Sequence, residues 1–97
     1  ENAQQLYNAA VTASMAQWGY SGAAVTSYLS QSGVAYGATD HLKKIGTQKW
    51  LAMYPDGMQA WAEWRRTGFP ELTPAQYATN TTKQIPRRFV YCTGEYG

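Results

Sequence analysis

Glycine and proline interrupt the chain at intervals that limit any regular element before Pro70 to fewer than about twenty residues. The breaks fall at Gly19, Gly33, Pro55 and Gly68. Proline and, less strongly, glycine are unfavourable inside a helix, and glycine commonly ends one. Between the breaks, apolar residues recur at intervals of three and four, which is the period of an α-helix. The sequence therefore predicts a mainly α chain built from short helices.

Four helices are predicted, near residues 2–18, 22–31, 40–54 and 56–67. The first has the clearest apolar stripe, which consists of Ala3, Leu6, Tyr7, Ala10, Val11, Ser14, Met15 and Trp18. We expect this stripe to be the packed face of its helix.

The residues at the predicted helix starts are ones that favour capping. Ser21 is the candidate N-cap of the second helix, and Thr39 or Asp40 that of the third. Pro55 or Asp56 opens the fourth helix, which Gly68 ends. Residues 33–40 are predicted to form a loop.

Residues 71–97 lose the helical period and are predicted to form an irregular tail. One apolar run, Phe89-Val90-Tyr91, favours a short strand or an extended segment. A long irregular tail typically lies along a larger body. The chain also has four Trp and eight Tyr in 97 residues, and such amphipathic rings favour interfaces. We therefore expect residues 1–97 to be a fragment with a large exposed apolar surface, covered in nature by partner chains, by domain swapping or by the absent parent domain.

Charge and cysteine content exclude several classes of protein. Eight Lys and Arg against six Asp and Glu give a net charge of +2, too little for a dedicated nucleic-acid interface. The single cysteine, Cys92, excludes an internal disulfide and a multi-cysteine metal site. No apolar stretch is long enough to cross a bilayer as a helix.

A search for catalytic groups finds little. His41 is the only histidine, so this chain alone cannot form a histidine metal cluster. Its neighbour Asp40 is interpreted as a helix cap. Glu63 and Glu71 lie in no recognisable catalytic pair and are expected to be solvated. Cys92 has no histidine near it in sequence and is expected to be inert, unless the fold brings arginines beside it. We predict that the chain is not an enzyme, and that it carries no metal or other cofactor.

The stretch "AWAEWRRTGFP", residues 60–70, has two interpretations. Its tryptophans and arginines could form a platform for a sugar ring or a base. Alternatively, Trp61 points into the core and Arg65, one turn later, is buried and held by Glu95 or by carbonyls near Gly68. Helical phase places Trp64 about 60° from the stripe of Trp61 and Arg65, so the four residues form no single flat face. Aromatics at helical spacing are usually core, which favours the structural interpretation. It predicts that Arg65→Ala lowers the melting temperature markedly and leaves ligand affinity nearly unchanged.

The order of motifs resembles the C-terminal portion of the SusD/RagB-type outer-membrane nutrient-binding lipoproteins. The resemblance rests on "IGTQKWLAMYPDGMQAWAEWRRTGFPELTP" (45–74), on "IPRRFVY" (85–91) and on Glu95, and the opening "LYNAAVTASMAQWG" (6–19) is similar to the family's preceding helix. The positions that match the family pattern are Thr47, Gln48, Lys49, Trp50, Gly57, Trp61, Glu63, Trp64, Arg65, Arg66, Thr67, Gly68, Phe69, Pro70, Ile85, Pro86, Arg87, Arg88 and Glu95.

The resemblance implies a larger helical-repeat (TPR-like) SusD fold, of which residues 1–97 would be the C-terminal segment. It also implies a non-catalytic protein that is lipid-anchored on the cell surface at the outer membrane. Such a protein holds a glycan, or in some members a peptide, for a SusC-like TonB-dependent transporter. The ligand contacts come mainly from regions absent here, so no ligand-binding residue is assigned. The shared motif is given a structural role, at Trp50, Trp61, Glu63, Trp64, Arg65, Arg66, Gly68, Pro70, Pro86, Arg87, Arg88 and Glu95.

The chain departs from the family pattern at two places. Cys92 stands where members commonly have proline, and the sequence stops at Gly97, before an expected asparagine-containing stretch. The helical scaffold and the lipidated cysteine that precede this region in the family are expected outside the chain. Cys92 is not that anchor.

Two other functions remain open. One is a small helical-repeat adaptor that binds another protein through exposed aromatics. The other is a fragment of a carbohydrate-active enzyme. Glycan binding would separate the proposed role from the adaptor, and carboxylate-dependent turnover would be needed to support the enzyme.

Overall fold

The computed structural model describes residues 2–96 and is mainly α, with no strand among these residues. The elements are α1 (Ala3–Gln17), α2 (Ala23–Leu29), α3 (His41–Ala52), α4 (Gly57–Thr67) and the 3-10 helix η1 (Thr93–Tyr96). The prediction of four helices is confirmed, and each observed helix lies inside its predicted range. Glu1 and Gly97, the ends of the predicted span 1–97, lie outside the described residues.

The ends of α4 follow the predicted signals. The Asp56 side chain accepts a hydrogen bond from the backbone N–H of Gln59 at 3.1 Å. At the other end Gly68 adopts a left-handed φ of 77° and its N–H donates to the Trp64 carbonyl at 2.8 Å. Both devices satisfy backbone groups that a helix leaves unpaired at its termini.

Two predicted caps behave differently. The prediction of Ser21 as the N-cap of α2 is wrong, because the chain turns one residue later, at Gly22 with φ 59°. Asp40 does occupy the N-cap position of α3, but it is left-handed, with φ 59°, and makes no side-chain capping bond. Capping side chains normally act from the extended region, which Asp40 does not adopt.

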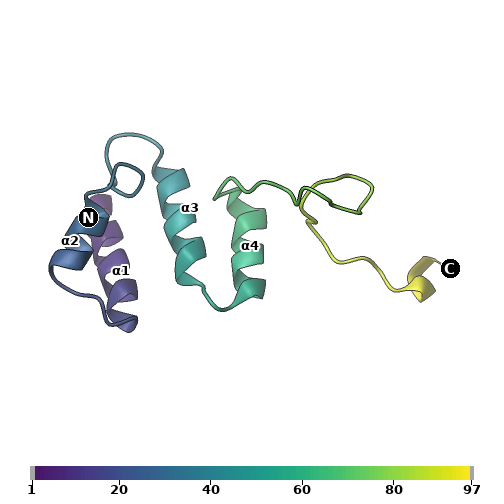
Figure 1. The fold of residues 1–97 in the computed structure, drawn as a ribbon, viewed down its shortest axis with the longest axis horizontal. Helices are drawn as coiled ribbons and strands as arrows, with labels where there is room; N and C mark the ends of the chain where they lie inside the picture. Colours follow the sequence, from purple (N-terminus) through teal and green to yellow (C-terminus); the bar gives the residue numbers. More distant parts are fainter. Residues whose placement is uncertain (1, 97) are drawn as a thin grey trace.

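The helices form a row in which each packs mainly on its neighbour in the row (Figure 1). The backbones of α3 and α4 lie side by side as a hairpin, and α1 lies against both α2 and α3. The buried apolar side chains are few, and comprise Tyr7, Val11, Val25, Val34 and Trp64. Tyr7 donates its hydroxyl to the Val34 carbonyl at 2.6 Å, which fastens the loop before α3 onto α1.

Gly46 allows α3 and α4 to approach closely. It is buried, and a Cβ built at this position would lie 3.1 Å from the Cβ of Phe69 and 3.4 Å from Oγ1 of Thr67. A larger side chain would hold the end of α4 away from α3.

The tail leaves the row and extends away from the helices to the C-terminal end (Figure 1). The short strand considered for residues 89–91 does not form, and these residues have no partner strand in the part of the chain that the structure describes. An isolated strand is not stable in water. No feature of the sequence predicted η1, which is a single turn.

Candidate functional site

Helix α4 presents different residues on two of its faces, and both sets belong to the predicted motif. Glu63, Trp64 and Thr67 are at least partly buried and lie at the helical spacing of one stripe, toward α3. Trp61 and Arg65, one turn apart, contact the tail instead. The motif therefore joins α4 to two separate parts of the chain.

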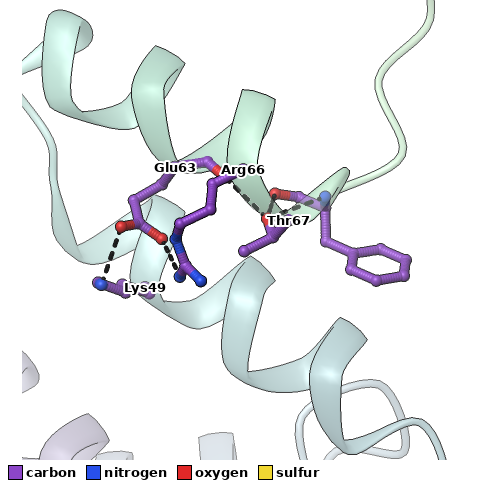
Figure 2. Close-up of polar contacts among 5 residues, drawn as sticks. Lys49, Glu63, Arg66 and Thr67 are labelled. Carbon is purple, nitrogen blue, oxygen red and sulfur yellow. Dashed lines mark hydrogen bonds and ion pairs between the residues drawn. The ribbon is translucent and has the colours of Figure 1, made fainter.

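On the α3 side, the Glu63 carboxylate binds two cations (Figure 2). Its Oε1 accepts from Lys49 Nζ of α3 at 2.9 Å, and its Oε2 accepts from Arg66 Nη2 at 2.6 Å. The hydrogen bond from Arg66, and then that from Lys49, lowers the pKa of Glu63 from its ordinary value of 4.5. The same bond raises the pKa of Arg66. The expectation that Glu63 is merely solvated is wrong, because its side chain is only 14% exposed.

Thr67 closes the end of this hairpin. Its hydroxyl donates to the Glu63 carbonyl at 2.8 Å and accepts from the backbone N–H of Phe69 at 3.2 Å (Figure 2). It therefore links the last turn of α4 to the residue that follows Gly68. This arrangement holds Phe69 against Gly46 of α3.

The buried tryptophan of the motif is Trp64, not Trp61. Trp64 is 8% exposed, and the Arg87 guanidinium lies over its ring at 4.9 Å from the centroid. Trp61 is only partly buried, with its indole Nε1 donating to the Pro86 carbonyl at 2.8 Å and its ring against Phe89. Helical spacing identified a stripe at Trp61 and Arg65, but the structure buries Trp64, on the neighbouring stripe.

The expectation that Arg65 is buried and held by Glu95 or by carbonyls near Gly68 is also wrong. Arg65 is exposed, its guanidinium stacks on Trp61 at 4.0 Å, and its Nη1 donates to the Arg87 carbonyl at 3.2 Å. Glu95 lies in η1, exposed, and forms no ion pair with it. The partner is a backbone carbonyl of the tail, which sequence spacing alone does not identify. The marked loss of stability predicted for Arg65→Ala therefore loses its structural basis, since an exposed arginine costs under about 1 kcal/mol.

The rest of the motif lies at turns and along the tail. Gly68 and Pro70 end α4 and begin the tail, and the Phe69–Pro70 peptide bond is cis, as is Tyr54–Pro55. Arg87 and Arg88 are exposed, and Arg88 stacks over Tyr91 at 4.8 Å.

A groove of about 690 Å³ runs between α1 and α3 and is almost entirely apolar. Its α1 wall is the whole stripe identified from the sequence, from Ala3 to Trp18, so the stripe was located correctly. The expectation that it is a packed face holds only in part, because Leu6 and Trp18 are 59% and 57% exposed. Such a volume is within the range of ligand pockets.

One polar contact at this groove was not anticipated. Tyr28 of α2 donates its hydroxyl to Oε1 of Gln48 of α3 at 2.8 Å, and both residues line the groove. Burial, and secondarily Tyr28, raises the pKa of the Tyr7 phenol on the same wall. Gln48 is one of the positions that match the family pattern, and no other feature of the sequence indicated this bond.

A second hollow, of about 520 Å³, adjoins the end of the groove and shares Trp18 and Leu51 with it. Trp50 and Tyr54 also line it, and the Trp18 and Tyr54 rings lie 5.9 Å apart. The two hollows make one apolar surface across the row. Trp50 of the motif is therefore partly accessible from this side.

The other residues considered for catalysis or metal binding lie apart from this surface or have ordinary partners. His41 stacks on Tyr36 at 4.2 Å, and its Nε2 lies 2.9 Å from the Gly37 carbonyl. Cys92 is exposed, and Glu71 pairs loosely with Lys43 at 3.5 Å. Within residues 2–96 no three acidic, histidine or cysteine side chains gather as a metal site would require.

Comparison with known families decides the assignment. A SusD-like family model, described as "Starch-binding associating with outer membrane", matches residues 1–92. The chain belongs to the SusD-like family. The resemblance seen in the motifs is thereby confirmed, and so is the helical fold class. SusD-like proteins are generally non-catalytic binding proteins associated with the outer membrane.

Neither the curated proteins nor the solved structures contain a match to this SusD-like chain. In the described part of the chain, no helix combines the length and the apolar character needed to cross a membrane.

Proposed function

We propose that this chain is the C-terminal part of a non-catalytic, RagB/SusD-type protein that binds a glycan at the cell surface. It is anchored to the outer membrane by a lipid outside this chain and delivers its ligand to a SusC-like TonB-dependent transporter. The observation that carries this proposal is the family match over residues 1–92. The SusD-like family is described as starch-binding, so an α-glucan is the first ligand to test.

Within such a protein, residues 1–97 contribute scaffold rather than ligand contacts. The Glu63 ion pairs and the Thr67 bridge hold the α3–α4 hairpin, and Trp61 and Arg65 attach the tail to it. These contacts join the motif residues to other parts of the same chain. That use supports the structural role given to the motif residues.

The ligand is tested by isothermal titration of the full-length protein with maltoheptaose, and with a panel of neutral and acidic oligosaccharides. We expect saturable binding of one glycan class and no release of reducing ends on prolonged incubation. If the protein binds only peptides, a peptide replaces the glycan as the proposed ligand. Turnover abolished by one carboxylate substitution would overturn its non-catalytic part.

The partner is tested separately, by co-purifying a tagged full-length protein from outer membranes. We expect a TonB-dependent barrel in the eluate, in about equal amount. An eluate without such a barrel, from membranes that contain it, would contradict the transporter role and leave glycan binding standing.

The adaptor alternative is favoured by one observation, the apolar groove between α1 and α3. Such a groove suits an amphipathic helix of another protein. A full-length protein that binds no glycan but retains a soluble helical partner through this groove would favour the adaptor.

A further inference from the structure

Three arginines near the junction of α4 and the tail carry charges that no carboxylate neutralises. Arg65, Arg87 and Arg88 form no ion pair among residues 2–96, whereas Arg66 and Lys49 share Glu63. All three are exposed. With a net charge of +2 for the whole chain, they place three positive charges near this junction.

The three guanidinium groups are held in place by the chain itself. Each stacks on an aromatic ring, Arg65 on Trp61, Arg87 on Trp64 and Arg88 on Tyr91. Arg65 and Arg88 each donate one hydrogen bond to a tail carbonyl, at 3.2 Å in both cases. A guanidinium has five N–H donors in a rigid fork, so most donors remain available, and such a fork matches a carboxylate. Stacking lowers the entropic cost of binding because the side chains are already ordered.

The adjoining backbone is also available. Phe89, Val90 and Tyr91 are 68%, 86% and 60% exposed, and no backbone hydrogen bond is donated by residues 89–92 within the described chain. Unpaired backbone of apolar, β-favouring residues is suited to pairing with an extended segment. Cations therefore lie directly beside a place where another chain could add as a strand.

We propose that this surface, Arg65, Arg87, Arg88 and Phe89–Tyr91, docks an extended acidic segment of a partner protein. Carboxylates of the segment pair with the three arginines, and its backbone pairs with residues 89–91. A glycan fits less well, because the guanidinium groups already cover faces of the Trp61 and Trp64 rings on which a sugar would stack. This docking goes beyond the proposed glycan binding and does not depend on it.

The test measures binding of fluorescein-labelled poly-L-glutamate of about twenty residues to the full-length protein by anisotropy, at low and moderate salt. The test variant is Arg65→Gln/Arg87→Gln/Arg88→Gln. The control, Lys43→Gln/Lys83→Gln, removes exposed positive charge elsewhere on the chain and leaves the Glu63 ion pairs intact. Heparin serves as the anionic-glycan probe, and maltoheptaose binding reports the proposed function in the same samples.

We expect the test variant to bind poly-L-glutamate roughly thirtyfold more weakly, which is about threefold for each arginine, and the control to bind within about twofold of the unmodified protein, because exposed pairs contribute modestly and additively. Amides of residues 89–92 should gain protection from hydrogen exchange with the probe. The proposal is overturned if the protein does not bind poly-L-glutamate, or if both variants lose the same affinity for it. It is also overturned if heparin binding depends on the three arginines and poly-L-glutamate binding does not. Thermal unfolding of both variants establishes that they are folded, and an unfolded test variant is replaced by Arg88→Gln alone, with an expected loss of about threefold.

Discussion

Two adjacent arginines on α4 serve different neighbours. Arg66 pairs with Glu63 on the α3 side, while Arg65 stacks on Trp61 and bonds the tail. Successive residues on a helix are about 100° apart, so a doublet naturally addresses two directions. The doublet at Arg87 and Arg88 similarly covers two different rings. Each arginine of a doublet in this chain therefore has a partner of its own.

The Glu63 cluster makes a prediction about pH. Because the folded state lowers the pKa of Glu63 below 4.5, its stabilising effect is fully present above that value and is lost as the pH falls through the folded pKa. Unfolding by urea, measured from pH 7 down to pH 3, should show a decline in the free energy of unfolding below about pH 4.5. In Glu63→Gln the stability at pH 7 should be lower and this decline smaller.

The matched control is Glu71→Gln, whose pair with Lys43 is 73% exposed on the glutamate side and 3.5 Å long. Glu71→Gln should not measurably change the free energy of unfolding at pH 7 or its decline as the pH falls. An unchanged pH profile in Glu63→Gln would show that the ion pairs drawn in Figure 2 do not stabilise the fold.

At the scale of elements, the α3–α4 hairpin depends on the absence of a side chain at Gly46. Alanine there would gain up to about 1 kcal/mol in helix propensity. Its Cβ would, however, meet Phe69 at 3.1 Å, and Phe69 is tied to Thr67 by its backbone. Overpacking of this kind costs about 1–3 kcal/mol, so the clash outweighs the propensity.

Gly46→Ala should therefore lower the free energy of unfolding, by about 1 kcal/mol, in chemical denaturation. Gly57→Ala is the control, because this helical glycine has no atom within 4 Å of a built Cβ and no positive φ. It should be neutral or slightly stabilising. Equal effects of the two substitutions would contradict the close approach of the two helices.

Helix number and limits were predictable because their causes are local. Asp56 and Gly68 act on residues within one turn, so their roles follow from sequence alone. The choice between Trp61 and Trp64 for the interior was not predictable, because it depends on how α4 packs on α3 and on the tail. The same holds for Arg65, whose partner is a carbonyl of residue 87. The α1 stripe was located correctly, but nothing in it indicated that much of it would remain open.

The molecule as a whole is extended. Its radius of gyration is 17.1 Å and its axes measure 56 × 30 × 27 Å. A compact chain of this length would have a radius of gyration of about 13 Å. Exposed apolar side chains lie on all its parts, including Leu42 at 78% and Tyr77 at 86%. The expectation of a large exposed apolar surface is confirmed.

Residues 1–97 expressed alone should therefore bind ANS strongly and associate as their concentration rises. Sedimentation velocity over a hundredfold range of concentration measures the association, and ANS fluorescence reports the open surface. The full-length protein at the same concentrations should show neither property. A monodisperse, ANS-negative fragment would mean that the groove closes on itself in solution.

The order of the helices in the row has a consequence for sequence variation. The backbone of α4 packs against α3, and α2 packs on α1 at the other end. Substitutions in α2 and in α4 thus share no direct backbone neighbour, and distant sites of this kind are nearly independent in their effects on stability. Substitutions at the two ends of the row can therefore accumulate separately, except at Tyr28 of α2, which is linked to Gln48 of the motif by a hydrogen bond.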